Sequence, residues 1–166
     1  MPDMVLRAFA EDDGPQLLRV LGEPKVSRWL RPAGNEVPFT PAECAARARA
    51  GAAHWAAHGF GPWIVLEEGR TVACGGLGLR LIEGGAELDL AWAVLPGAWG
   101  RGIATQIGHR ALALARIQRA REVVALTRTD NHASRRVMDK LGMAAHRELR
   151  HAGFPHVLYR VDIGSA

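Results

Sequence analysis

Apolar and polar residues follow one another along the chain in patterns that separate strands from helices. Seven short apolar runs bounded by Gly, Pro or acidic residues predict strands, at 5–9, 62–67, 71–79, 87–95, 122–127, 143–150 and 156–163. Longer segments with apolar residues three or four apart predict helices, at 11–21, 40–58, 102–119 and 129–142, with a short one inside the loop-rich segment 22–39. The pattern predicts an α/β domain whose mixed central sheet of about seven strands is flanked by helices.

The helix 102–119 connects strand 87–95 to strand 122–127, and a helix between two strands makes them parallel. This βαβ unit should be right-handed. We expect the buried side of its helix to include four apolar residues, Ile103, Ile107, Leu112 and Leu114.

The helix 40–58 has strong signals at its ends. Thr40 can cap it, Pro41 fits its first position, and Glu43 completes a capping box. Its His54 and His58 lie four residues apart on one face and could share a metal ion. Because no third ligand is evident nearby in the sequence, we expect no metal.

Three glycines interrupt the apolar strand 71–79, at Gly75, Gly76 and Gly78. Glycine inside a strand indicates a bulge or a close approach of another backbone. The segment is not a phosphate-binding loop, because no helix follows it and the Lys–Ser/Thr pair of such loops is absent.

The length of 166 residues suits one domain, 1–166, with 48% hydrophobic and 23% charged residues as in ordinary soluble proteins. No apolar run approaches the roughly 20 residues of a membrane span. Residues 1–5 lack the basic and apolar regions of a signal peptide. We therefore expect a cytoplasmic protein with no membrane partner, in which Cys44 and Cys74 are buried and reduced.

The formal net charge of +4 favours binding of an anion. No basic block is interleaved with aromatic residues, so the charge alone does not indicate nucleic acid. A phosphorylated small molecule fits better, and the stretch 92–104 offers a site for it. There an apolar strand ends at Pro96, Gly100 and Gly102 follow, and a helix begins. An ordinary strand–helix connection can look the same, so the rest of the chain must decide.

The first turn of a helix has backbone N–H groups without an intrahelical partner, and its dipole makes that end positive. Glycines let the backbone come close to a ligand. These properties predict a phosphate or pyrophosphate site at residues 100–105.

Segments spread over nearly the whole chain resemble the GNAT acetyltransferases, and within them the branch of ribosomal-protein N-terminal acetyltransferases. The matching segments are 6–13, 58–63, 88–96, 99–105 and 129–143. The resemblance implies the GNAT fold, with a splayed parallel strand pair at the cofactor site. It also implies direct transfer of an acetyl group from acetyl-CoA to a primary amine.

The family's cofactor turn matches Trp99–Ala104, with Trp99 where the family has Gln or Arg. The resemblance implies that backbone amides hold the pyrophosphate, those of Arg101, Gly102, Ile103, Ala104 and Thr105. It implies that the preceding strand pairs its backbone with the pantetheine arm, at Ala93, Val94 and Leu95. It also implies that the amide of Asn131 contacts the cofactor arm, although Asn131 is equally suited to cap a helix.

An attacking amine must be neutral, so a general base should remove its proton. Asp89 matches the acid that precedes the strand bulge in this branch, where Glu is usual. The shorter Asp makes a bridging water plausible. Alternatively, Asp89 binds the substrate ammonium or pairs with an arginine. Glu87 is the other candidate for the base.

Ser134 resembles the serine proposed in this branch to protonate the departing CoA thiolate. In much of the superfamily a tyrosine has that role, but Tyr159 matches no motif. Ser134 is therefore expected to be the acid, unless it is only a residue of the first helical turn.

Three functions remain open from the sequence. The first is an acetyl-CoA-dependent N-acetyltransferase, acting on a protein N-terminus or a small amine such as an amino acid or an aminoglycoside. The second is a catalytically weak CoA-binding or sensing domain. The third, a nucleic-acid binder, rests on charge alone. We expect segments 22–39 and 151–155 to line the acceptor side, and either a monomer or a homodimer is compatible with the sequence.

Overall fold

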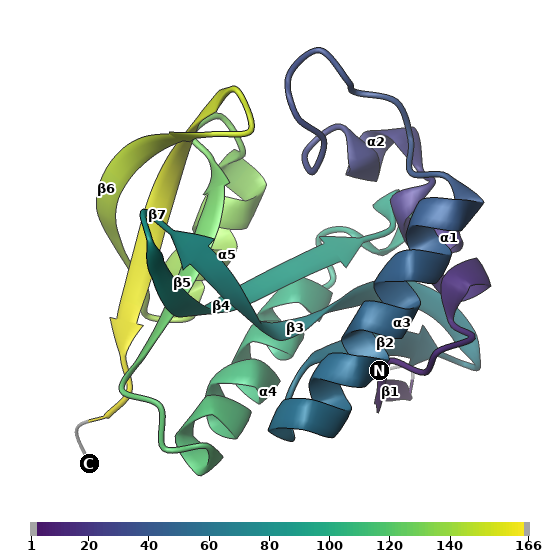
Figure 1. The fold of residues 1–166 in the computed structure, drawn as a ribbon, viewed down its shortest axis with the longest axis horizontal. Coiled ribbons are helices and arrows are strands. Elements are labelled where there is room, and N and C mark those ends of the chain that lie inside the picture. Colours follow the sequence, from purple (N-terminus) through teal and green to yellow (C-terminus); the bar gives the residue numbers. More distant parts are fainter. Residues whose placement is uncertain (1–2, 165–166) are drawn as a thin grey trace.

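A computed structural model describes residues 3–164 and shows a single seven-stranded sheet with helices on both faces (Figure 1). Its strands are β1 (Met4–Ala8), β2 (Pro62–Glu67), β3 (Arg70–Ile82), β4 (Gly85–Val94), β5 (Glu122–Arg128), β6 (Ala144–His151) and β7 (Phe154–Asp162). Its α-helices are α1 (Gly14–Leu21), α2 (Pro24–Ser27), α3 (Pro41–His58), α4 (Ile103–Ile117) and α5 (His132–Lys140), and η1 (Pro96–Ala98) is a short 3₁₀ turn. The predicted α/β class and mixed sheet are confirmed. The assignment of 1–166 to one domain remains a prediction, and residues 1, 2, 165 and 166 lie outside the described part.

The strand order is β1-β2-β3-β4-β5-β7-β6, and β4 and β5 are parallel while the other neighbours are antiparallel. The parallel register is recorded at one position, Asp89 opposite Val124. Beyond it β4 turns away from β5 (Figure 1). The predicted splayed parallel pair is therefore present, and Asp89 marks the point where the two strands separate.

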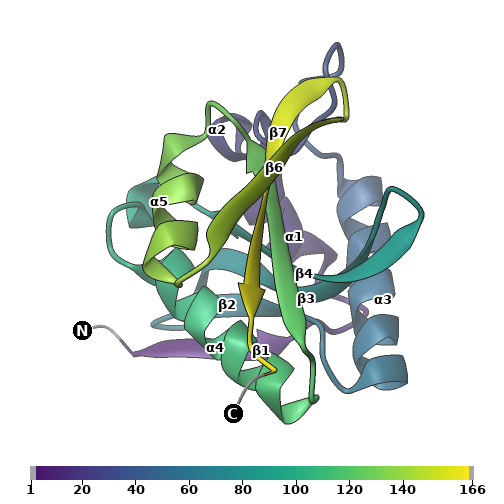
Figure 2. The same cartoon turned by 90° about the vertical axis from the view of Figure 1, so that its left-hand side faces the viewer.

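Two helical layers cover the sheet (Figure 2). On one face, α1 and α3 pack Leu17 and Cys44 against Ile64 and Cys74. On the other face, α4 and α5 bury Leu112 and Met138 together with residues of β3, β4, β5 and β7. Apolar burial, worth about 1.5–3 kcal/mol per large side chain, holds β4 between the two layers, because Leu90 packs on the α4 side and Ala93 on the α1 side, and it holds β5 against α4 and α5.

Helix α3 begins and ends where the sequence predicts. The Thr40 hydroxyl accepts a hydrogen bond from the Glu43 N–H at 3.2 Å, and the Glu43 carboxylate accepts one from the Thr40 N–H. Gly59 follows the last turn with φ of +73°, a conformation that glycine adopts without strain. The capping box predicted from Thr40 and Glu43 is confirmed.

The predicted close approach at the glycines of β3 is confirmed for two of the three. A Cβ on Gly75 would lie 2.4 Å from the carbonyl oxygen of Ala91, and one on Gly76 would lie 2.6 Å from that of Gly61. Gly78 is different, because a Cβ there meets no atom within 4 Å. The recorded bulge between β2 and β3 lies at Val65 and Leu66 rather than at these glycines.

Smaller differences concern element ends and burial. Strand β3 extends past Leu79 to Ile82 because the β3–β4 hairpin pairs up to Ile82 and Gly85. Leu114 is only partly buried, whereas Ile103, Ile107 and Leu112 are buried as expected. Cys44 and Cys74 are free and buried. Within the part of the chain that the structure describes, no helix is long and apolar enough to cross a membrane.

Candidate functional site

A cavity of about 880 Å³ opens where β4 and β5 separate. Its wall combines the end of β4, the first turn of α4, the end of β5, the start of α5, the α2 region and the β6–β7 turn. Both segments predicted to lie on the acceptor side contribute to it. The first contributes Lys25, Val26 and residues 28–31, and His151, Ala152 and His156 come from or lie beside the second. The topology therefore brings the expected cofactor and acceptor residues to one cavity.

The predicted anion site lies on this wall. Gly100 and Gly102 have φ of +73° and +78°, and a Cβ on either would meet no protein atom within 4 Å. Gly102 is the N-cap of α4, and no side chain caps the helix. The N–H groups of Ile103, Ala104 and Thr105 in this first turn are therefore free for a ligand.

The Arg101 side chain points away from the cavity that Gly100 and Gly102 line. Its Nη2 donates to Glu67 Oε1 at 2.6 Å, and its side chain does not line the cavity. The Arg101 side chain therefore pairs with Glu67 at the protein surface. The role predicted for its backbone amide is unaffected.

The predicted pantetheine-pairing residues lie at the end of β4, and two of their polar groups are already bonded. Trp99 Nε1 donates to the Val94 carbonyl at 2.7 Å, and the Leu95 N–H donates to Val72 O at 2.9 Å. Ala93 and Val94 line the cavity, whereas Leu95 does not. The Leu95 N–H is therefore not available to a cofactor arm.

Asn131 and Ser134 lie together at the start of α5 and both line the cavity. Asn131 is the N-cap, since its Oδ1 accepts a hydrogen bond from the Ser134 N–H at 3.2 Å. The Ser134 hydroxyl makes no hydrogen bond to a described residue. Tyr159 is buried outside the cavity lining, and its hydroxyl accepts a hydrogen bond from Arg135 Nε at 3.1 Å.

Asp89 lies behind the cavity wall and is 6% exposed. Its Oδ2 is 3.0 Å from Arg80 Nε, and Arg80, not Asp89, lines the cavity. Its Oδ1 has no hydrogen-bond partner among the described residues. Burial raises the pKa of Asp89 to about 6, although Arg80 partly offsets this rise. The pairing with an arginine considered for this acid is present.

The rival acid Glu87 is held elsewhere. Its Oε1 lies 3.4 Å from Arg160 Nη2, and Glu87 does not line the cavity. Arg160 also pairs with Glu122 at the start of β5. Glu87 thus belongs to an ion-pair group near the start of β4, whereas the predicted cofactor residues lie at its end.

His156 is a cavity residue that the sequence did not single out. It is buried, and its Nδ1 lies 3.0 Å from the Phe154 carbonyl oxygen. A carbonyl can only accept, so Nδ1 carries the hydrogen and Nε2 is left with a lone pair. Burial, together with the positive charges of Arg128 and Arg80, lowers the pKa of His156, which keeps the ring neutral near pH 7.

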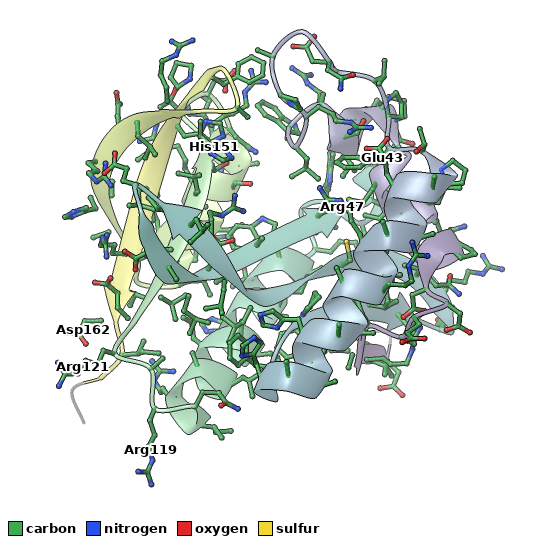
Figure 3. The ribbon with its side chains drawn as sticks, viewed as in Figure 1. Glu43, Arg47, Arg119, Arg121, His151 and Asp162 are labelled. Atoms are coloured by element: carbon green, nitrogen blue, oxygen red, sulfur yellow. The ribbon has the colours of Figure 1, made fainter. Side chains whose placement is uncertain are left out.

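Arg80 and Arg128 are further cavity residues outside the sequence prediction. One signal existed for Arg80, a lone cation in the otherwise apolar run 77–82. His151 lies on the side of the β6–β7 pair that faces α2 (Figure 3).

No group of three or more His, Cys, Asp or Glu side chains within residues 3–164 is arranged to hold a metal. His54, one of the two histidines considered for a metal, has its Nδ1 2.8 Å from the carbonyl oxygen of Phe60.

The family model of the acetyltransferase (GNAT) domain matches residues 3–144. The chain belongs to this GNAT family. Solved structures of low sequence identity share its fold. A GNAT-family protein from Bordetella pertussis is 24% identical, with 95% of this chain and 94% of that chain covered and a TM-score of 0.77.

Two other solved structures share the GNAT fold. A protein from Salmonella typhimurium, solved with its cofactor acetyl-CoA, is 16% identical over 99% of this chain and 96% of its own, with a TM-score of 0.77. A ribosomal-protein-alanine N-acetyltransferase from Brucella melitensis is 19% identical over 96% and 99%, with a TM-score of 0.75. At these identities the likeness establishes the GNAT fold.

Proposed function

We propose that this GNAT domain transfers the acetyl group of acetyl-CoA directly to a primary amine, either a protein N-terminal α-amine or a small-molecule amine. The observation that carries the proposal is the shared cavity. The free N–H groups at the start of α4 open into the same space as Ser134 and His156. A phosphate-binding end and proton-transfer groups in one cavity suit transfer from a phosphorylated donor.

The residues present fit acetyl-CoA, whose contribution when bound is an activated acetyl thioester. The amides of residues 101–105 would hold its pyrophosphate, and β4 backbone near Ala93 and Val94 would pair with its pantetheine arm. Asn131 would add its side-chain amide. An N–H of β4 near Val94 would polarise the thioester carbonyl as negative charge develops on the oxygen.

We propose Asp89 as the general base that acts through a bridging water. Its unpartnered Oδ1 and its pKa of about 6 suit a group that accepts a proton near neutral pH. Arg80 lies between Asp89 and the cavity, so Asp89 would reach the amine through the water and not by direct contact. His156 is a second candidate base because its Nε2 lone pair belongs to a residue on the cavity wall.

Two kinds of amine are candidate acceptors. Neighbours named as ribosomal-protein-alanine acetyltransferases, at 14% and 19% identity, make a peptide N-terminus one of them. A small amine is the other. A screen of thiol release from acetyl-CoA over peptides and small amines tests the activity itself. Tight binding of acetyl-CoA without any thiol release would instead favour a CoA-sensing domain.

Gly102→Ala tests the cofactor site. The new Cβ meets no protein atom, but it would stand where a phosphate must approach the α4 amides. We expect the Kd for acetyl-CoA to rise about tenfold or more, because the methyl group would keep a phosphate from the α4 amides, and a hydrogen bond to a charged group is worth about 1.5–3 kcal/mol. Isothermal titration calorimetry measures the effect.

Gly142→Ala is the matched control for Gly102→Ala. Gly142 has φ of +77°, meets no atom within 4 Å, and does not line the cavity. It should therefore lose similar stability and keep its affinity for acetyl-CoA. Equal affinities of the two variants would contradict a phosphate site at Gly102.

Ser134→Ala tests the predicted acid. If the hydroxyl protonates the leaving thiolate, kcat should fall on the order of tenfold. This is less than usual for acid catalysis, because a thiol of pKa near 8.5 leaves readily. Ser134→Thr keeps a hydroxyl and should restore most of the rate. Steady-state kinetics between pH 6 and 9 measure both variants, and wild-type rates for Ser134→Ala throughout that range would leave Ser134 with a structural role.

A further inference from the structure

The cavity wall is rich in positive charge. Its cationic residues are Lys25, Arg28, Arg31, Arg80, Arg128 and Arg136. Among the described residues that line it, the acid is Asp130, and its carboxylate accepts hydrogen bonds from Arg128 Nε at 3.0 Å and Nη2 at 2.8 Å. No described carboxylate on this wall is free to receive an ammonium group. The cations of the wall would therefore repel a polycationic acceptor, and no described carboxylate there is free to bind its ammonium groups.

Arg80 places one of these charges at the reaction centre. Its Nε lies 3.0 Å from the buried Asp89, at the position where β4 and β5 separate. Its two terminal nitrogens make no hydrogen bond to a described residue, and the side chain is 33% exposed. Asp89 precedes Val94 by five residues, about 17 Å of extended strand, so Arg80 pairs with β4 well before the end of the strand that leads to the phosphate site.

Arg28 adds a second cation. The ring of Trp29 lies between two guanidinium groups, with the Cζ of Arg28 4.7 Å and that of Arg128 4.9 Å from its centroid. Arg128 also stacks on Phe154 at 3.8 Å. The Arg28 side chain makes no hydrogen bond to a described residue, so its donors are free. Planar guanidinium groups with free donors are suited to bind carboxylate or phosphate in a two-point contact.

A backbone hydrogen bond joins two segments that border this part of the cavity. The Ala33 N–H donates to the Ala152 carbonyl at 2.9 Å, which joins the loop after α2 to the β6–β7 turn. Leu30 and Arg31 from one segment and Ala152 from the other line the cavity. The two segments lie beside each other in Figure 2. A small molecule fits under such a connection more easily than the N-terminus of a folded protein.

We infer that the acceptor is a small amine that carries an anionic oxygen group, a carboxylate or a phosphate, and that Arg80 and Arg28 bind this group. The inference rests on the proposed transferase function and narrows its acceptor. With the anion held by the guanidinium groups, the amine can lie near the point where β4 and β5 separate. Asp89 then has a positioning role as well, because it holds Arg80 by its Nε and leaves the terminal nitrogens free.

Pairs of amines that differ in one charged group test the inference. Neutral amino acids are compared with their amides, and phosphoethanolamine with ethanolamine, while spermidine and a short peptide complete the panel. We expect kcat/KM to be at least about tenfold higher for the anionic member of at least one pair, as for hydrogen bonds to a charged partner. The amide has the lower amine pKa and hence more neutral amine, so reactivity alone would give the opposite order. The two pairs distinguish a carboxylate from a phosphate.

Two arginine variants localise the effect. Arg28→Gln, at an exposed residue, should raise KM for the anionic substrate about tenfold, keep kcat, and leave the amide unchanged. Arg80→Lys keeps the charge beside Asp89 and should raise the same KM less than Arg80→Met does. Arg110→Gln, an exposed change on α4 outside the cavity lining, should leave every parameter as in the wild type.

The outcomes separate this inference from the transferase proposal. Turnover of amides, spermidine or peptide as efficient as that of the anionic amines would overturn the inference and leave the transferase proposal standing. The same holds if neither Arg28→Gln nor Arg80→Met changes the preference for the anionic member. If acetyl-CoA binds by calorimetry but no amine in the panel is acetylated, the transferase proposal fails and the inference fails with it.

Discussion

Asp89→Asn is expected to lower kcat by about 100-fold or more, the usual contribution of a positioned general base. The carboxylate must be ionised to accept a proton, and its pKa is raised to about 6. In the wild type, kcat should therefore fall as the pH drops through about 6. The variant should lack this decline, because an amide does not titrate in this range. Steady-state rates between pH 5 and 9 with a reactive amine measure the effect, and the Kd for acetyl-CoA should stay unchanged.

Two matched variants identify the group responsible for the decline. Glu87→Gln should keep both the rate and the decline, because Glu87 pairs with Arg160 away from the cavity. If Asp89→Asn retains the decline while His156→Gln loses it together with the rate, His156 is the base instead. If Asp89→Asn changes only the KM of anionic acceptors, its role is to position Arg80.

The same variant has a readout in folding that does not depend on catalysis. Because burial raises the pKa of Asp89 from 3.8 to about 6, the folded state resists its ionisation. Ionisation of Asp89 should by itself remove about 3 kcal/mol of stability from the wild type as the pH rises from about 4 to about 6, since each pKa unit corresponds to 1.36 kcal/mol. Asp89→Asn avoids this loss, so its stability relative to the wild type should increase over that window in urea unfolding. A constant difference between the two proteins would mean that Asp89 is not buried as an unfavourable charge.

Periodicity and end signals are sufficient to predict this fold because they are local. The period of apolar residues distinguishes strand 62–67 from helix 41–58, and Thr40 and Glu43 define the start of that helix through contacts only three residues apart. The parallel pairing of β4 and β5 also follows from sequence, because a helix connects them. Strand ends such as Ile82 are less predictable, since they depend on how far a partner strand continues pairing.

The cavity is lined both by residues predicted from contiguous motifs and by residues that only the sheet brings together. Gly102, Asn131 and Ser134 belong to short segments, and all three line the cavity. Arg80 and His156 come from β3 and β7, and only the sheet order places them near β4 and β5. For Asp89, the position on β4 could be predicted from the sequence. Its pairing with Arg80 could not, because that pairing depends on the register between β3 and β4.

Gly75→Ala is expected to be among the most destabilising single substitutions in the sheet. The new Cβ would lie 2.4 Å from the Ala91 carbonyl oxygen and 2.7 Å from the Cα of Trp92. Both atoms belong to the backbone of β4, so no side-chain rotation relieves the clash. We expect a loss of about 3 kcal/mol in the free energy of unfolding, at the upper end for overpacking. Urea denaturation followed by circular dichroism measures it.

Gly78→Ala is the matched control on the same strand, since its Cβ would meet no atom within 4 Å. Its stability should stay within about 0.5 kcal/mol of the wild type or rise slightly, because alanine loses less backbone entropy on folding. Equal losses in the two variants would mean that β3 cannot accept any side chain and that contact with β4 is not the cause. Where Gly75→Ala still folds, β4 must move, and Ala91 and Trp92 on the cavity wall move with it. A weaker affinity for acetyl-CoA in that variant would show that close packing of β3 against β4 holds the cofactor-binding strand in position.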